Sequence, residues 1–160
     1  MKRFILCFCI SLFLSGCAHV VSQEMRDRAD KGVTPVVLFQ NPDEFAGRIV
    51  ILGGFIVNTE TKDDGSYIEV VQNPLDFTGR PEDRDISSGR FLIFVEGYID
   101  IAIYSAGREI TVAGEILGRK VQALGEAEYS YLLIRGEELH LIKQRKDFPI
   151  HFGIGIWKSF

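Results

Sequence analysis

The chain has 160 residues, with 22 acidic and 18 basic side chains and a formal net charge of −4. This length is enough for one domain with a hydrophobic core and is short for two domains. The acidic balance makes a nucleic-acid partner unexpected.

The first 16 residues have the features of a signal peptide. Lys2 and Arg3 precede an apolar run of 11 residues, Phe4 to Leu14, and small residues follow it. This is the order of a positive n-region, an h-region and a cleavage site. Because a helix needs about 20 apolar residues to cross a bilayer, a permanent transmembrane span is the weaker interpretation. We therefore expect residues 1–16 to be removed.

The sequence Leu14-Ser15-Gly16-Cys17 resembles the lipobox that lipoprotein signal peptidase cuts. We expect cleavage between Gly16 and Cys17, and a diacylglycerol thioether on the Cys17 sulfur. Two acyl chains, usually with a third on the new amino group, are enough for stable anchoring in a membrane. The alternative is an ordinary secretory signal followed by an incidental cysteine.

Cysteine usage agrees with export. Cys7 and Cys9 lie in the segment to be removed, so Cys17 is the one thiol of the mature chain. A disulfide, thiol catalysis and a cysteine metal site are therefore not expected. Cleavage also removes Lys2 and Arg3, which leaves 16 basic and 22 acidic side chains and a formal balance of −6.

Residues 17–32 are expected to form the lipidated amino terminus and a tether. Ala18 to Gly32 are mostly polar and charged, which favours a plain solvated linker. A helical turn or two is possible over Glu24 to Ala29.

The pattern from residue 33 to residue 147 predicts an all-β domain. Asn41 and Pro42 indicate one helical turn, with Asn41 as cap. A strand over Arg48 to Asn58 is apolar on both faces and contains Gly53-Gly54, which suggests a sharp bend. Asp63-Asp64-Gly65 predicts a hairpin.

Later segments complete the predicted sheet. Asn73 to Arg90 is a loop of nearly 20 residues, and a loop of that length is usually functional or disordered. Asp100 to Ala106 is ambiguous between helix and loop, and Gly118 to Ala127 reads as a charged turn. The other expected strands are Ser66 to Gln72, Phe91 to Tyr98, Glu109 to Leu117 and Tyr129 to Lys143, the last interrupted near Gly136.

Five strands with internal glycine bends predict a small, curved antiparallel barrel of OB-like form with short helical turns. The residues expected in its core are Ile49, Ile51, Phe55, Ile68, Leu92, Val112 and Leu133. This core should bury enough apolar area to fold without metal or disulfide.

The sequence offers little catalytic chemistry. His19, His140 and His151 do not have the spacing of a metal motif, and we expect a structural or solvent role for His140. Glu82, Asp83 and Asp85 are interleaved with arginines, which favours a self-neutralised loop over a calcium site. No nucleophile elbow, P-loop or zinc-protease motif is present. We expect no catalytic residues, no metal, no cofactor and no enzyme, and a hydrolase is the least favoured class.

The last 13 residues, 148–160, are rich in Phe and Ile and hold the one Trp of the chain. Packing across the barrel is the favoured interpretation. A membrane-interface contact by Trp157, Lys158 and Phe160 is the alternative.

Several runs together resemble the Slp family, the starvation-inducible outer-membrane lipoproteins of Gram-negative bacteria. They are the lipobox, Pro42 to Gly54, Val71 to Asp76, Gly89 to Leu92 and Ile110 to Ile116. The resemblance covers roughly residues 14–157. It implies a lipoprotein with no established catalytic activity, anchored in outer-membrane lipid through its acyl chains and handled by the lipoprotein-processing and sorting machinery.

Ala18 after Cys17 agrees with release to the outer membrane, since Asp there would suggest retention in the inner membrane. The domain is expected to face the periplasm and to have a structural or starvation- and stress-related role in the envelope. The alternative is a binding module for an oligosaccharide, a peptide or an envelope protein partner, on the barrel face or on the loop Asn73 to Arg90.

Overall fold

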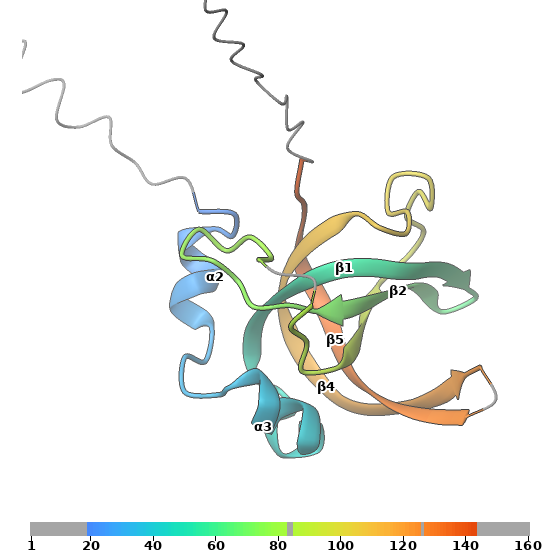
Figure 1. The fold of residues 1–160 in the computed structure, drawn as a ribbon, viewed down its shortest axis with the longest axis horizontal. Coiled ribbons are helices and arrows are strands. Elements are labelled where there is room, and N and C mark those ends of the chain that lie inside the picture. Colours follow the sequence, from blue (N-terminus) through green and yellow to red (C-terminus); the bar gives the residue numbers. More distant parts are fainter. Residues whose placement is uncertain (1–18, 83–84, 126, 144–160) are drawn as a thin grey trace, which may run out of the picture.

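The fold is a closed five-stranded barrel (Figure 1). The computed structural model describes residues 19–82, 85–125 and 127–143. The strands are β1 (Ile49–Lys62), β2 (Gly65–Gln72), β3 (Arg90–Val95), β4 (Glu109–Leu124) and β5 (Ala127–Leu141). Around the barrel they follow the order β1-β2-β3-β5-β4, and all neighbouring pairs are antiparallel except the parallel pair β3 and β5. The all-β, OB-like expectation is confirmed.

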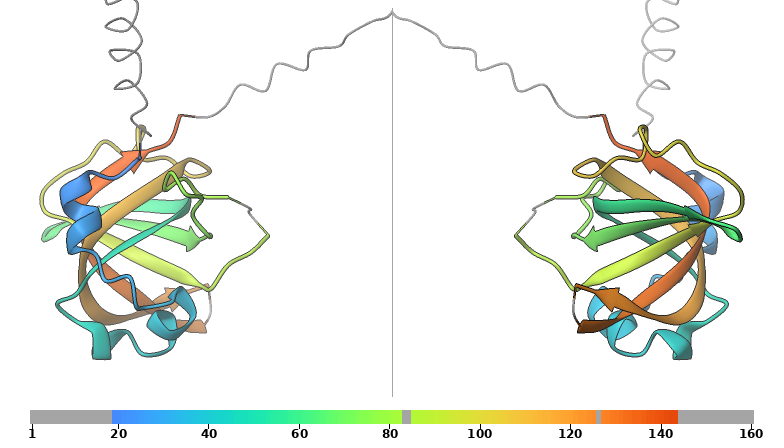
Figure 2. Two further views of the ribbon diagram at one scale, coloured as in Figure 1. Left: turned by 90° about the vertical axis from the view of Figure 1, so that its left-hand side faces the viewer. Right: turned by 90° about the vertical axis from the view of Figure 1, so that its right-hand side faces the viewer.

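From residue 19 onward, three short helical elements precede β1: α2 (Gln23–Arg28), α3 (Pro35–Gln40) and the 3-10 turn η2 (Pro42–Phe45). The turn after Asn41 was predicted, whereas α3 was not, because Val36, Val37 and Phe39 favour strands. Pro35 in the first turn and the burial of Leu38 in the core explain the helix. α3 lies at the lower end of the barrel (Figures 1 and 2). In the described part of the chain, no helix is long and apolar enough to cross a membrane.

The core is formed by alternate residues of the strands. On β1 the buried apolar side chains are Val50, Leu52 and Ile56, one residue out of phase with the predicted Ile49, Ile51 and Phe55, which are only partly buried. The prediction for β1 was wrong because both faces of this strand are apolar, so alternation carries no information about which face is inside.

Predictions for the other strands were closer. Ile68, Leu92 and Val112 are buried as expected, whereas Leu133 is partly buried beside the core residues Leu132 and Ile134. The full set of buried residues in the main cluster is Leu38, Val50, Leu52, Ile56, Ile68, Val70, Phe91, Ile93, Ile110, Val112, Ile116, Leu132 and Ile134.

The hairpin of β4 and β5 is longer than expected. The segment Gly118 to Ala127, predicted to be a turn, is mostly strand, because β4 runs on to Leu124. The interruption near Gly136 is present as a bulge, where Ala113 pairs with Glu138 but Gly114 pairs with Gly136. Bulges of this kind bend and twist a strand and so help the sheet to close.

The glycine pair in β1 lies where the strand pairs with two neighbours at once. Gly54 is paired with Gln72 of β2 and with Ile110 of β4. A Cβ on Gly54 would lie 1.8 Å from the carbonyl oxygen of Val71, a backbone atom that cannot move aside alone. Glycine is therefore required by close approach at this corner of the barrel.

We predict that Gly54→Ala destabilises the protein by about 1–3 kcal/mol, the usual range for overpacking. Urea unfolding followed by circular dichroism measures this loss. Gly32→Ala is the control, because its Cβ would meet only the side-chain oxygen Oδ1 of Asp30, at 3.3 Å, and should change stability by less than about 0.5 kcal/mol. Equal stability of the two variants would contradict the role given to Gly54.

Candidate functional site

The amino-terminal segment, defined here as residues 19–31, packs on the outside of the barrel. Val21 and Met25 are each 3% exposed and form an apolar cluster with Ala113 of β4. Ile49 and Ile51, on the outer face of β1, pack against this cluster. The expectation of a plain solvated linker is therefore wrong for these residues.

Backbone hydrogen bonds hold both ends of the segment. The Val20 amide donates to the carbonyl oxygen of Thr78 at 2.8 Å, and the Asp30 amide donates to the carbonyl oxygen of Ile49 at 2.8 Å. The first bond joins the segment to the long loop after β2, and the second joins it to the start of β1. The segment is thus fixed to the barrel from Val20 onward.

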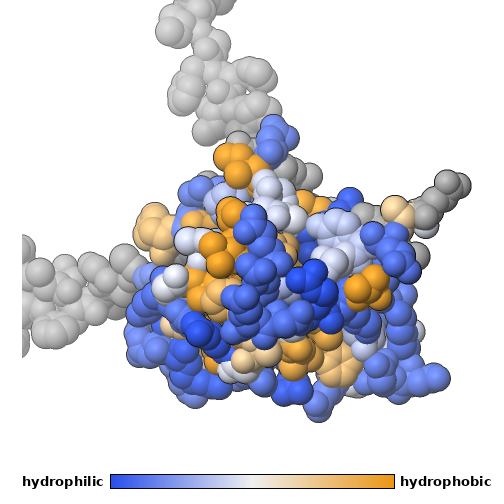
Figure 3. All heavy atoms as spheres, turned by 90° about the horizontal axis from the view of Figure 1, so that it is seen from below, coloured by the Kyte–Doolittle hydropathy of each residue, from blue (hydrophilic) through white to orange (hydrophobic). Residues whose placement is uncertain are grey.

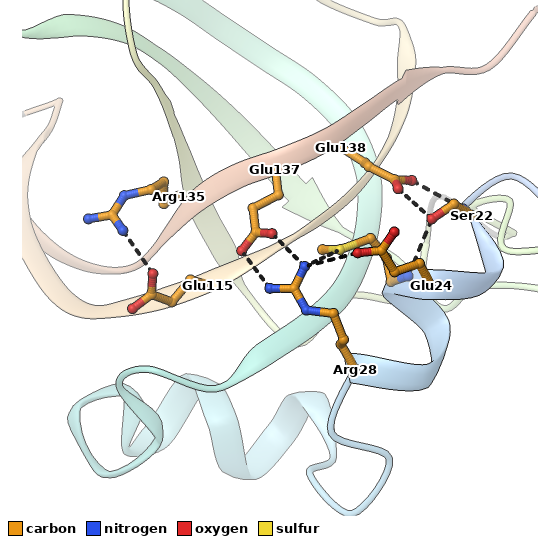
Figure 4. A network of polar contacts seen from close by, with 8 residues as sticks. Ser22, Glu24, Arg28, Glu115, Arg135, Glu137 and Glu138 are labelled. Carbon is orange, nitrogen blue, oxygen red and sulfur yellow. Dashed lines mark hydrogen bonds and ion pairs between the residues drawn. The ribbon is translucent and has the colours of Figure 1, made fainter.

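Side chains of β5 bind the segment from the other side (Figure 4). Ser22 donates from its amide nitrogen, at 3.1 Å, and from its hydroxyl to the Glu138 carboxylate. Arg28 Nη1 lies 3.0 Å from Glu137 Oε2. Glu137 is the residue that the bulge in β5 leaves without a partner across the strand pair. The bulge therefore places two consecutive carboxylates beside α2.

The sequence explains why α2 forms at residues 23–28. The Ser22 hydroxyl caps the helix by accepting from the Met25 amide at 3.3 Å. A helix of six residues is too short to be stable in water alone, so its stability comes from packing. Val21 and Met25 are four residues apart, a spacing that places two apolar side chains on one face of a helix. This spacing indicates a packed helix, which the polar composition of the segment as a whole does not suggest.

Contacts between the amino-terminal segment and the barrel lower the pKa of two carboxylates. The Ser22 hydrogen bond is the main cause that lowers the pKa of Glu138 below its ordinary 4.5, and His140, 3.1 Å away, lowers it further. The Arg48 side chain, 2.7 Å from Asp30, is the main cause that lowers the pKa of Asp30. His140 thus lies beside Glu138, and the structural or solvent role expected of it stays a prediction.

A pocket of about 480 Å³ lies between the amino-terminal segment and the loop of residues 75–79. Asp76 Oδ1 shapes this loop by accepting from the Thr78 amide, the Thr78 hydroxyl and the Arg80 amide, and these bonds lower the pKa of Asp76. The Thr111 hydroxyl ties the loop to β4 by donating to the Gly79 carbonyl oxygen at 2.7 Å. This part of the long loop is therefore ordered by its own hydrogen bonds.

The pocket is lined by apolar and charged side chains, among them the buried cationic end of Arg26. Val21, Ile51, Leu75 and Phe77 line it, and Phe77 is 80% exposed. Arg26 also lines it, and its buried Nη1 atom has no hydrogen-bond partner within residues 19–82, 85–125 and 127–143, while Nη2 donates to Gln23. The remaining lining residues are His19, Gln23, Asp27, Ala29, Asp30, Lys31, Asp76, Thr78 and Gly79. A buried hydrogen-bond donor without a partner lowers the stability of the fold. This atom is therefore suited to donate a hydrogen bond to an anionic group of a ligand.

The predicted site residues are distributed unevenly. Gly16, Cys17, Asp83, His151 and the tail 148–160 lie outside the described residues. Glu82 and Asp85 are exposed. Within residues 19–82, 85–125 and 127–143, no three His, Cys, Asp or Glu side chains converge as metal ligands would. His19 is brought to the pocket, which sequence reasoning did not anticipate.

Residues 14–152 match the model of the outer membrane lipoprotein Slp family. The chain is 28% identical over 131 residues to the uncharacterized lipoprotein YeaY of Escherichia coli (strain K12), which covers 78% of this chain. It is also 28% identical over 105 residues, 64% of this chain, to an uncharacterized protein of Haemophilus influenzae. The matches span 64% and 57% of the lengths of these two relatives.

Solved structures with a similar fold include single-stranded DNA-binding proteins. Mitochondrial Rim1 of S. cerevisiae matches with a TM-score of 0.40 and 15% identity, over 62% of this chain and 99% of its own. A small protein of this class from Streptomyces coelicolor matches with a TM-score of 0.34 and 10% identity, over 60% of this chain and 94% of its own. At these identities the likeness says nothing of function.

We predict that the contact between Ser22 and Glu138 weakens only in acid. Because folding lowers the pKa of Glu138, the carboxylate contributes its full stability above pH 4.5, and this contribution is lost as the pH falls through the lower folded pKa. The NMR shift of the Ser22 amide should therefore titrate with a midpoint below 4.5. Glu138→Gln should abolish this step, and a midpoint at or above the ordinary value would contradict the assigned contact.

Proposed function

Because the chain belongs to the outer membrane lipoprotein Slp family, we propose that it is a structural or stress-related component of the envelope, lipidated at Cys17 with its barrel facing the periplasm. Residues 1–16 act as the signal peptide, and cleavage falls between Gly16 and Cys17. The Slp match and the YeaY relative support the lipoprotein assignment.

One observation carries the proposal: the segment docked on the barrel begins almost at the proposed anchor. Val20 is already bonded to the Thr78 carbonyl oxygen, and three residue steps separate it from Cys17. Even fully extended, those steps span about 10 Å. The acyl chains would then hold the barrel against the membrane surface, where a long solvated tether would let it diffuse away.

This proposal changes the expected division of the chain. A lipidated terminus of two or three residues leads directly into the folded domain, in place of a tether that reaches residue 32. Such a short connection suits a protein whose partner or role lies at the membrane surface. The role of the tail 148–160 stays a prediction.

We predict that Cys17→Ser leaves the full precursor uncleaved and without acyl label, because the thioether must form before the peptidase cuts. Mass spectrometry of the purified protein and membrane fractionation check this. Ser15→Thr, which keeps a small residue next to the cleavage site, serves as the control and should be processed. A mature terminus elsewhere, or an unmodified Cys17 in the wild-type protein, would contradict the proposal.

The pocket supports a second candidate function, the binding of an apolar ligand that carries one anionic group. Its apolar walls would hold the chain of such a ligand, and Arg26 Nη1, buried and unpaired, would receive the anion. Three carboxylates also line the pocket, and each accepts from another group: Asp27 from Gln23, Asp30 from Arg48 and Asp76 from its own turn.

We predict that octanoate, a short acyl chain with a carboxylate, shifts the NMR signals of Val21, Leu75 and Phe77. Arg26→Gln should weaken this binding severalfold, because it removes the charge from the unpaired donor. Lys31→Gln, at an exposed lining position, is the matched control and should have little effect. Binding that Arg26→Gln leaves unchanged would rule out this role for the pocket.

A further inference from the structure

The loop between β3 and β4, residues 96–108, presents three large apolar side chains to solvent. Tyr98 is 84% exposed, and Ile101 and Ile103 are each 49% exposed. The neighbouring Ile99 and Tyr104 instead turn inward and pack against the main core. The loop therefore has an inner pair of apolar residues, Ile99 and Tyr104, and an outer triplet, Tyr98, Ile101 and Ile103.

Hydrogen bonds hold this loop in shape, so the outer triplet is not free to collapse. The amides of Ile103 and Tyr104 both donate to the Asp100 carbonyl oxygen at 3.0 Å. The Thr59 hydroxyl of β1 donates to the Tyr104 carbonyl oxygen at 2.6 Å, and Arg108 Nη1 donates to that of Ile103 at 2.6 Å. Exposure of three apolar side chains on a turn of fixed shape indicates an interaction site, where a partner covers them.

The loop lies at the end of the barrel from which the anchored terminus leaves. In the ribbon views, which share a vertical axis, the start of the described chain, the loop of residues 96–108 and the end of β5 all lie at the upper end (Figures 1 and 2). Contacts agree with this placement. Ser22 is bonded to Glu138 near the end of β5, and Lys143 shares a hollow with Ser105, Ala106 and Arg108 of the loop.

We propose that Tyr98, Ile101 and Ile103 insert into the membrane leaflet that holds the acyl chains of Cys17. This inference rests on the lipidation proposed above. The chain between Cys17 and the docked Val20 is so short that this end of the barrel must meet the bilayer, whose apolar interior covers isoleucine and whose interface suits tyrosine. Arg108 and Lys143 line a hollow beside the loop, and side chains of this length can extend a cationic end toward the headgroups.

Charge does not drive this contact. Glu96 and Asp100 balance Arg108 and Lys143, and the Asp100 carboxylate already accepts from the Ala102 amide at 2.9 Å. Insertion should therefore depend on apolar burial and be insensitive to salt. The lower end of the barrel offers the comparison, since hydrophilic side chains cover most of it with apolar ones between them (Figure 3).

The test places a spin label on the full lipidated protein in vesicles of phosphatidylethanolamine and phosphatidylglycerol. Ile101→Cys carries the label in the loop, and Val37→Cys on α3, 44% exposed, is the matched control. Thioether formation blocks Cys17 from labelling. We expect the label at 101 to be severalfold more accessible to oxygen than to a water-soluble nickel reagent, and the label at 37 to show the reverse, at low and at high salt.

Two outcomes would overturn the inference. One is a label at position 101 as accessible to nickel as the label at 37, with mass spectrometry showing acylated Cys17, which leaves the proposed function intact. The other is shielding at 101 that disappears when residues 148–160 are deleted, because the tail and not lipid would then cover the loop. An unmodified Cys17 would instead remove the proposed function and this inference together.

Discussion

The packing of Val21 and Met25 on the outer face of the barrel is the interaction on which the rest of this structure depends. That face is formed by Ile49 and Ile51 of β1 and by Ala113 of β4. Burial of each of the two side chains contributes about 1.5–3 kcal/mol. Without it, a six-residue helix would be a fluctuating coil and the outer face of β1 would expose its apolar side chains to water.

This packing explains features of the sheet that are otherwise separate. β1 is apolar on both faces because its inner face meets the core and its outer face meets α2. The bulge at Glu137 interrupts the pairing of β4 and β5 at the position where Arg28 needs a carboxylate. The ordered part of the long loop, which carries Thr78, closes the other side. Segment, bulge and loop thus form one packed unit on the outside of the barrel.

Much of the fold could be predicted from local pattern. The hairpin at Asp63-Asp64-Gly65 and the bend at Gly53-Gly54 follow from residue types that few other conformations favour. The predicted phase of β1 was wrong, since a strand that is apolar on both faces does not reveal its inner side. α3 was not predicted because its valines favour strands. The helix forms because it buries Leu38 in the core.

The candidate site was harder to predict because it depends on contacts between distant segments. Lipidation at Cys17 is predicted from a short motif, but nothing local indicates that Ser22 meets Glu138 or that Arg26 lines one pocket with Leu75 and Phe77. Polar composition suggested a solvated linker, and just two apolar residues with helical spacing overrode it. Tertiary packing, which a single sequence does not display, therefore determines both the pocket and the docking of residues 19–31 on the barrel.

Hydrogen exchange of the Val20 and Asp30 amides tests the central claim most directly, because each donates to a carbonyl oxygen outside the helix it flanks. If the amino-terminal segment is docked, both amides should exchange much more slowly than unstructured peptide, and more slowly than the exposed amide of Lys31. Exchange of both at the rate of an unstructured chain would show that the segment is a free tether and that the barrel is not held at the membrane surface.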